Sequence, residues 1–287
     1  MNLADLVLAR CPGLLWHADG QCSFHGALLD LYQRLDRLFA GWAHIWEAEE
    51  HLFPPFIAAE ALQRVNYFES FPHLVTFPVA LDAEPSNLSA FSRINAGTGN
   101  AAVQLTRIAA PRSALTPAAC YHFYHNLRGT RCEQPRYLTT RATCFRRESH
   151  YAPLERQWSF TMREIVCFGT AAEVTEFLAR ARNTLTATFR DLDLPVEWRS
   201  ATDPFFDPSR NPRYLAQKLD PVKTEMVFDD RVVIGSVNFH RNYFGEAFDI
   251  RRDGEAAFTG CVAFGLERWM YAWLSRFGPD ARAWPLP

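Results

Sequence analysis

The stretch CFRRESHYAPLERQWSFTMREIV, residues 144–166, decides the fold of this 287-residue chain. It places arginine beside glutamate in two short segments on either side of a polar loop, and both segments alternate as β-strands do. Ion pairs on the surface of a hairpin contribute little to stability. Two interpretations are therefore open: a solvated, salt-bridged hairpin, or a binding site for a ligand that is both anionic and aromatic.

The side chains of this hairpin could form a nucleotide clamp. Strand alternation puts Arg146 and Glu148 on one face, about 7 Å apart, while Phe160, Met162 and Glu164 share a face of the return strand. A guanidinium group offers forked donors to a phosphate, a carboxylate can accept from an exocyclic amine, and an aromatic ring can stack on a purine. Arg146 would bind phosphate, Glu148 the adenine edge, and Phe160 would lie beneath the ring.

The composition describes a soluble protein with a large core. Hydrophobic residues make up 48% and the net charge is −2, so no global basic field favours binding a long nucleic acid. The seven cysteines are scattered and form no C-x-x-C pair, which is typical of a reduced cytoplasmic protein. Residues 1–16 lack the features of a signal peptide, and no stretch approaches the roughly 20 apolar residues that span a bilayer, so we expect no membrane association.

Periodicity along the chain predicts an α/β (α+β) fold. Helices are expected at 24–50, 53–65 and 171–192, and a strand followed by a helix at 260–277. Strands are expected at 73–81, 134–148, 157–169, 194–202 and 232–240, with a strand or short helix at 114–127 and a loop at 200–221. Strands dominate the centre with antiparallel connections, helices flank them, and no heptad-patterned arm is present.

The segment GLER, residues 265–268, points to a second binding feature. Gly265 lies at the bend from strand to helix, where a glycine allows backbone or ligand to approach closely. Arg268 lies in the first helical turn, where a positive charge opposes the helix dipole unless an anion is bound. The alternative is an exposed arginine that lies over its own helix.

Three segments in order resemble the motifs of class II aminoacyl-tRNA synthetases. Residues 53–72 resemble the first motif, FRRE with RQWSF (145–148 and 156–160) the second, and GLER the third. The resemblance covers about residues 50–280. It implies an antiparallel sheet flanked by helices, a homodimer whose seam is the first motif, and a division into an N-terminal helical extension (1–50) and a catalytic domain (51–287).

Within that class, the chain resembles the seryl-tRNA-synthetase-like amino acid:[carrier protein] ligases, which lack the tRNA-binding arm. The matching segments are PAACYHFY (117–124), TMREIV (161–166) and SVNFHRNYFG (236–245). The resemblance implies ATP-dependent, AMP-forming activation of glycine or alanine as an aminoacyl-adenylate. The aminoacyl group is then transferred to the phosphopantetheine thiol of an acyl or aminoacyl carrier protein, without tRNA.

Three alternatives to this ligase remain. The chain could be a synthetase that charges tRNA, a non-catalytic paralogue acting as a regulatory or binding subunit, or a zinc-only interaction domain. The synthetase would need a partner to hold tRNA, because no basic stripe is present. A non-catalytic paralogue or a zinc-only domain would not need the arginines of the second and third motifs.

The resemblance also assigns metal ligands. It places zinc on Cys120, Glu164 and Cys261, and three protein ligands leave a fourth position open for the substrate amine. Without the resemblance, both cysteines would be interpreted as buried small side chains. Residues expected to be structural instead are His122, His125, His240, Cys132 and Cys144.

For the nucleotide, the resemblance implies Arg146 at the α-phosphate, Arg156 at the γ-phosphate, and Arg268 over adenine and at the γ-phosphate. Arg146 and Arg268 are therefore the expected catalytic residues, and Glu148 and Phe160 keep the adenine roles given above.

Magnesium and substrate contacts are expected at Glu225 and at Ser236 with Asn238. Here the chain departs from the seryl enzymes, which carry an acid a few residues before Ser-x-x-Asn where this chain has Val232 and Val233. An acidic carrier protein would require a basic face. Arg180 and Arg182 could supply that face, or could simply belong to a solvated helix surface.

Overall fold

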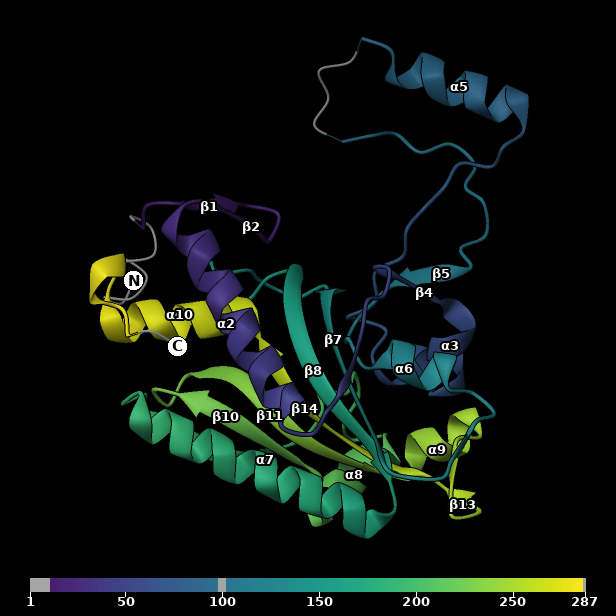
Figure 1. Cartoon of the computed structure of the whole chain (residues 1–287). Coiled ribbons are helices and arrows are strands. Elements are labelled where there is room, and N and C mark those ends of the chain that lie inside the picture. Colours follow the sequence, from purple (N-terminus) through teal and green to yellow (C-terminus); the bar gives the residue numbers. More distant parts are fainter. Residues whose placement is uncertain (1–10, 98–101, 286–287) are drawn as a thin grey trace.

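The computed structural model describes residues 11–97 and 102–285 (Figure 1). The expectation of a missing signal peptide falls partly on residues 1–10, which lie outside this description. At the centre is a seven-stranded sheet in the order β3-β7-β8-β14-β11-β10-β9. Its strands are β3 (Glu49–His51), β7 (Arg136–Phe145), β8 (Ser159–Gly169), β9 (Val196–Ala201), β10 (Lys223–Phe228), β11 (Val232–Arg241) and β14 (Phe258–Gly265).

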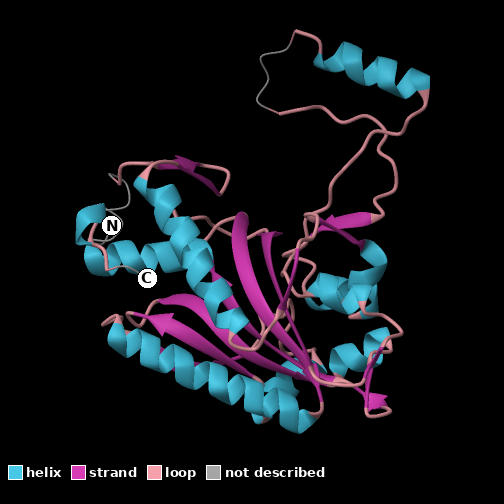
Figure 2. Ribbon diagram, viewed as in Figure 1, coloured by secondary structure: helices cyan, strands magenta, loops and turns pink. Residues whose placement is uncertain are grey.

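All neighbours in this sheet pair antiparallel except β3 with β7, which are parallel. The expected antiparallel sheet flanked by helices is therefore confirmed (Figure 2). The central strands β8 and β14 are almost wholly buried, because helices cover both faces. Their apolar residues therefore run nearly without interruption, as is typical of such strands.

Three long helices cover one face of the sheet: α2 (Ala27–His44), α7 (Ala171–Asp191) and α10 (Leu266–Phe277). Helix α7 begins at a capping box, in which the Thr170 hydroxyl accepts from the backbone of Glu173 and the Glu173 carboxylate accepts from the backbone of Thr170. These helices agree with the predicted periodicity. The predicted boundary near residue 50 stays a prediction, since α2 packs into the same core as α7 and α10.

A buried ion pair ties α2 to the sheet. Arg163 on β8 is 3% exposed and donates to both oxygens of Asp36 on α2, with Nε–Oδ1 at 2.7 Å and Nη2–Oδ2 at 3.2 Å. It also donates to Glu50 at 2.9 Å. Arg163 therefore points toward the helices, so its sequence neighbour Glu164 points to the other face of the sheet.

The other face carries short helices and small sheets. The helices are α3 (Ala59–Arg64), α4 (Tyr67–Ser70), α6 (Tyr121–Asn126), α8 (Pro212–Leu219) and α9 (Tyr243–Phe248). The small sheets pair β4 (Phe56–Ala58) with β5 (Ser113–Leu115), and β12 (Arg251–Arg252) with β6 (Arg131–Cys132) and β13 (Glu255–Ala256). A second apolar core lies between these elements and the sheet.

Two predictions about helices are wrong. Residues 53–65 were expected to be helical from the proline pair onward, but β4 comes first and α3 begins only at Ala59. The loop expected at 200–221 contains α8, which Asn211 caps and which begins at Pro212. The start of α8 follows ordinary helix chemistry, because proline is favoured at the first helical position and asparagine just before it. Helix α3 instead follows Ala58, whose side chain makes no capping hydrogen bond.

Residues 76–97 and 102–112 project from the body as an arm that ends in α5 (Pro85–Asn95) (Figures 1 and 2). The strand predicted at 73–81 is wrong: this segment is extended, but only Leu81 forms a bridge, to Ile108 of the returning chain. Of the apolar residues that suggested a strand, Leu74 is buried, but Phe77 and Val79 are 41% and 54% exposed.

At the N-terminal end, β1 (Leu14–His17) and β2 (Gln21–Phe24) form a hairpin that the sequence analysis missed. The short 3₁₀ helix η1 (Ala281–Ala283) follows α10. None of the described helices is both long and apolar enough to span a membrane.

Candidate active site

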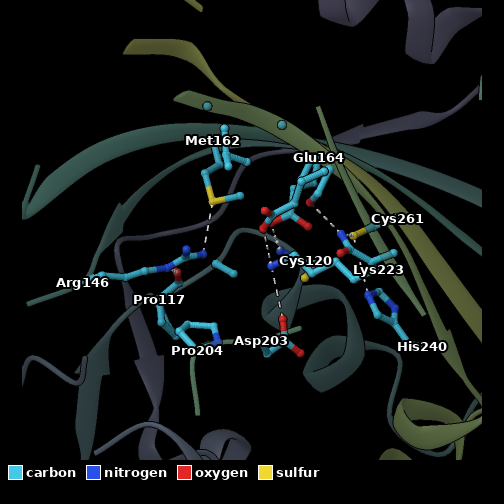
Figure 3. A pocket seen from close by; sticks show the side chains of 18 of the residues that line it. Pro117, Cys120, Arg146, Met162, Glu164, Asp203, Pro204, Lys223, His240 and Cys261 are labelled. Carbon is cyan, nitrogen blue, oxygen red and sulfur yellow. Dashed lines mark hydrogen bonds and ion pairs between the residues drawn. The ribbon is translucent and has the colours of Figure 1, made fainter. Parts of the chain in front are cut away.

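A cavity of about 470 Å³ opens on the face of the sheet away from α2, α7 and α10. Strands β8, β14, β11 and β10 form its floor. The loop 146–158 and the segment 200–221 contribute its walls, together with α6 and α9 (Figure 3). Nearly every residue expected to contact substrate or metal lines this one cavity.

The strand register explains why these residues meet. Glu164 lies opposite Ala263, which lies opposite Ser236, and Ser236 lies opposite Glu225. Residues directly opposite each other share a face. The neighbouring row, two residues further along each strand, runs Val166, Cys261, Asn238 and Lys223. The two rows bring residues nearly 100 positions apart into one cavity.

One end of the cavity gathers sulfur and carboxylate groups. Cys120 precedes α6, and its backbone N–H donates to Oε1 of Glu164 at 3.3 Å. The Asn238 amide donates to the sulfur of Cys261 at 3.2 Å, and the same sulfur lies 3.6 Å from Nε2 of His240. Cys120, Glu164 and Cys261 are all buried. The three expected metal ligands therefore line the same end of one cavity (Figure 3).

Acidic groups lie close together at this end of the cavity, and their burial and proximity shift their pKa values. Burial, and then the proximity of Cys261, raises the pKa of Glu164 to about 8. The Cys120 thiol hydrogen-bonds to Cys261, which raises the pKa of Cys120 and lowers the pKa of Cys261. Such a donor set suits a thiophilic cation. Within residues 11–97 and 102–285, however, no three His, Cys, Asp or Glu side chains are already gathered closely enough to hold one.

His240 is the contact at this end that sequence reasoning missed. It was expected to be structural, and its Nδ1 does lie within hydrogen-bonding distance of Tyr124 and Thr259, at 3.2 and 3.1 Å. Its other nitrogen faces Cys261. His122, in contrast, hydrogen-bonds Thr116 in the core, and burial lowers its pKa to about 4.

The other end of the cavity gathers arginines. Arg146 donates from Nε to the Pro117 carbonyl at 2.8 Å, and its guanidinium lies 5.2 Å from the centre of the Phe160 ring. Arg268 donates to the carbonyls of Glu155 and Val233 at 2.8 and 2.9 Å. These carbonyl oxygens therefore partly offset the charge of Arg268, a role that the sequence analysis expected a bound anion to play.

These arginines repel one another. Burial, and then the charges of Arg146 and Arg156, lowers the pKa of Arg268. Glu148 and Glu225 oppose that shift only in part. A buried arginine whose pKa is lowered by neighbouring arginines favours the binding of an anion with several charges.

The positions of Glu148 and Glu225 differ from what the sequence suggested. Strand β7 ends at Phe145, so strand alternation does not place Glu148 beside Arg146. Glu148 instead forms an ion pair with Arg156 at 2.7 Å. Glu225 forms an ion pair with Lys223 at 3.1 Å, so its carboxylate is engaged by the ammonium group of that lysine.

The segment 200–221 contributes a group of residues that sequence reasoning missed. Asp203 is an ion-pair partner of Lys223 at 3.4 Å, and Gln217 donates to Asp203 at 2.9 Å. Both line the cavity, as does Arg213. The capping pair Asn211-Pro212 was the available signal that this segment holds a helix rather than a loop.

Arg180 and Arg182 lie on α7, which covers the opposite face of the sheet from the cavity. Arg182 lies over the ring of Trp198, and Arg180 pairs with Glu176 in the same helix at 4.0 Å. A carrier protein that delivers its thiol to the cavity would therefore approach from the side away from these two arginines.

Glu267 provides a pH test of this site. Its carboxylate accepts the Thr161 N–H, and burial raises its pKa to about 7. The folded state thus keeps a proton that the unfolded chain loses above about pH 4.5, so stability is lost as pH rises toward 7. Glu267→Gln cannot ionise. Relative to wild type, its free energy of unfolding should rise by up to about 3 kcal/mol between pH 4.5 and 7.5 in urea titrations.

The control is Glu176→Gln, which changes an exposed glutamate on α7. Its free energy of unfolding should run parallel to that of wild type across the same pH range. A Glu267→Gln curve that also ran parallel to wild type would contradict the assignment.

The chain has relatives of two kinds. The family described as "tRNA synthetase class II core domain (G, H, P, S and T)" matches residues 109–277. Amino acid--[acyl-carrier-protein] ligase 1 of Bradyrhizobium diazoefficiens is 35% identical over 243 residues, which cover 81% of this chain and 73% of that protein. Ligase 2 of the same organism is 34% identical, covering 82% and 71%.

The type-2 serine--tRNA ligase of Methanopyrus kandleri is 27% identical and covers 83% of this chain, but the match spans only 50% of that enzyme. Among solved structures, the M. kandleri SerRS in complex with A. aeolicus tRNASec matches with a TM-score of 0.81 at 21% identity. It covers 99% of this chain and 59% of the other. The chain therefore belongs to the class II tRNA synthetase core family and, within it, to the amino acid--[acyl-carrier-protein] ligases.

Proposed function

We propose that this chain is an ATP-dependent ligase that loads a small amino acid, glycine or alanine, onto the phosphopantetheine thiol of a carrier protein. The observation that carries the proposal is the polarity of the cavity: arginines gather at one end and acidic groups at the other. An amino acid and ATP that react in one site need both ends. The relatives named as ligases for acyl-carrier proteins support the choice of acceptor.

At the arginine end, Arg146 would hold the α-phosphate, while Arg156 and Arg268 would hold the γ-phosphate. Bound phosphates would relieve the repulsion among these guanidinium groups, so ATP would bind where the charges now oppose each other. Phe160 would stack on adenine once Arg146 turns toward phosphate, and Glu148 would accept from its amino group. Mg²⁺ would neutralise phosphate charge, with Glu225 as its candidate protein ligand.

At the acidic end, Cys120, Glu164 and Cys261 would hold Zn²⁺. Two thiols and a carboxylate are ordinary zinc ligands, and three of them leave a fourth position open. When bound, the ion would hold the amine of the amino acid, so that the substrate carboxylate faces the arginines. The buried, like-charged donors support this assignment, although they would have to close in around the ion.

The reaction has two steps. An oxygen of the amino acid carboxylate attacks the α-phosphorus of ATP, the bond to the β-phosphate oxygen breaks, and pyrophosphate leaves. The carrier thiolate then attacks the carbonyl carbon of the aminoacyl-adenylate, a thioester forms, and AMP leaves. Arg146 would neutralise the charge that develops on the α-phosphate in the first step and hold AMP as leaving group in the second, so catalysis is mainly positioning and neutralisation.

The surroundings of Cys261 favour a short substrate. Asn238 and His240 contact the sulfur, and the Lys223 ion pairs occupy the neighbouring strand. A long side chain on Cα would displace these groups, so glycine and alanine fit best.

We also propose that the chain forms a homodimer. Of the fifteen large hydrophobic side chains that are exposed in the described residues, seven lie in the arm. They are Phe77, Val79, Leu88, Ile94, Val103, Leu105 and Ile108. Soluble monomers rarely expose apolar groups at this density, and a second copy would cover them. Seven free cysteines support a reduced, cytoplasmic location.

The function is tested by pyrophosphate exchange across the amino acids, followed by loading of a phosphopantetheinylated carrier protein. We expect exchange with glycine or alanine, and a thioester that hydroxylamine cleaves. A carrier protein whose phosphopantetheine serine is replaced by alanine is the control and should remain unloaded. Charging of serine tRNA in place of the carrier would identify a tRNA synthetase, and absence of exchange with every amino acid would refute the ligase.

Cys261→Ala should lose zinc and amino acid activation together. Metal content is measured by elemental analysis and activation by pyrophosphate exchange, which should fall at least about 100-fold because the amine loses its anchor. Cys132→Ala removes a buried thiol outside the cavity and should keep both. Activation that survives the loss of metal would contradict the zinc role.

The dimer is tested by light scattering coupled to gel filtration. Wild type should elute with twice the mass of one chain, and the double variant Val103→Asp, Leu105→Asp should elute as a monomer, because charges would be placed in the apolar contact. Leu219→Asp changes a leucine outside the arm that is even more exposed, at 87%, and should stay dimeric. A wild-type mass of one chain would rule the dimer out.

A further inference from the structure

The β1–β2 hairpin lies outside the stretch 109–277 that matches the synthetase family, yet it touches the loop that forms one wall of the cavity. The loop 146–158 carries Glu148, Glu155 and Arg156 between the ends of β7 and β8. Within the loop, the backbones of Ala152 and Arg156 hydrogen-bond to each other in both directions. The placement of the loop over the cavity also depends on what lies against it.

The hairpin contacts this loop at Gly20. The Gly20 carbonyl accepts the backbone N–H of Trp158 at 2.8 Å, at the point where the loop enters β8. The Tyr151 ring lies against Gly20 on its other side. A Cβ added to Gly20 would lie 2.7, 2.8 and 2.9 Å from three atoms of that ring. The φ of Gly20 is +87°, a conformation that side chains other than glycine rarely adopt.

The two aromatic side chains join these contacts into one unit. The rings of Tyr151 and Trp158 are nearly parallel, 6° apart in orientation, with centroids 6.5 Å apart. The indole N–H of Trp158 donates to the Thr76 hydroxyl at 2.9 Å, at the root of the arm. Trp158 is thus held by the hairpin through its backbone and by the arm root through its side chain.

The hairpin also supports the middle of the loop. Leu154 is fully buried and has a positive φ of 59°, and its backbone hydrogen-bonds the thiol of Cys22 on β2. The next residue, Glu155, presents its carbonyl to Arg268 at 2.8 Å. A continuous series of contacts therefore links β2 to the arginine end of the cavity.

We propose that the β1–β2 hairpin positions the nucleotide-binding loop, and that Gly20 is the positioning residue because only glycine allows the Tyr151 ring and the Trp158 N–H to approach together. The proposal rests on the assignment of ATP to the arginine end. It predicts a selective effect: the loop carries groups for the nucleoside triphosphate, whereas β8, β11 and β14 hold the acidic end. Loosening the hairpin weakens ATP binding and spares the amino acid.

The test is Gly20→Ala, compared with Gly254→Ala. Gly254 lies in the turn between β12 and β13 with φ +82°, and a Cβ there would meet nothing within 4 Å. The two variants thus share the backbone strain, and only Gly20→Ala adds the collision with Tyr151. Binding of a non-hydrolysable ATP analogue is measured by calorimetry, both KM values by pyrophosphate exchange, and folding by thermal unfolding.

For Gly20→Ala we expect the Kd of the analogue and the KM for ATP to rise about tenfold, with the KM for the amino acid within about twofold of wild type. Gly254→Ala should match wild type in all three. Thr76→Val, which removes only the acceptor of the Trp158 indole, should raise the KM for ATP about threefold. If Gly20→Ala does not fold, Thr76→Val and Tyr151→Ala decide by the same selective rise.

Equal nucleotide binding by Gly20→Ala and Gly254→Ala would overturn the proposal, and so would KM values for both substrates that rise together. Either result would leave the proposed function intact, because wild type would still bind the analogue and exchange pyrophosphate. A wild-type protein that binds no nucleotide would instead remove the ATP site itself, and the role of the hairpin with it.

Discussion

The buried ion pair between Arg163 and Asp36 fixes which face of β8 meets the helices, and the site follows from it. A guanidinium that is 3% exposed must keep its carboxylate partner, because an unpaired buried charge is costly. Strand alternation then sends Glu164 to the other face. The register with β14 and β11 adds Cys261 and Asn238 on that face. A shift of one residue in β8 would exchange the two faces.

The cavity is acidic at one end and basic at the other. Burial and then Cys261 raise the pKa of Glu164, while burial and then the neighbouring arginines lower the pKa of Arg268. Each end is thus destabilised by its own like charges and would be relieved by a ligand of the opposite sign. A zwitterion that lies between them has only one favourable orientation, with its amine at the acidic end and its carboxylate toward the arginines. Under the proposed function, this is the orientation that attack on the α-phosphate would need.

Local patterns predicted the elements that carry most of the site. The hairpin around 144–166, helix α7 and the strand-to-helix bend at Gly265 all have strong periodicity, and α7 also has a capping box. Each forms at the expected place, although β7 ends at Phe145, before Arg146 and Glu148. The segment 73–81 failed because an apolar, extended stretch looks like a strand whether or not it has a partner. In this chain Phe77 and Val79 remain exposed on the arm.

What sequence reasoning missed depends on contacts between distant segments. His240 meets Cys261 only through the pairing of β11 with β14, and Lys223 enters the cavity only because β10 lies beside β11. The β1–β2 hairpin is too short to have a strong signal of its own. Cys120 and Cys261 are 141 positions apart, so no local spacing could have paired them, and the resemblance to known enzymes was needed to single them out.

The order of the strands in the sheet determines when the site can form during synthesis of the chain. Strand β8 has its two sheet neighbours on opposite sides in the sequence: β7 just before it, and β14 about 90 residues later. While the ribosome is still adding the residues between them, β8 has one open edge, and Glu164 has no Cys261 beside it. Arg268 emerges last, with α10. The nascent chain therefore cannot complete the cavity until β14 and α10 have left the exit tunnel, and until β14 pairs, the open edge of β8 is a place where another unfinished chain could pair.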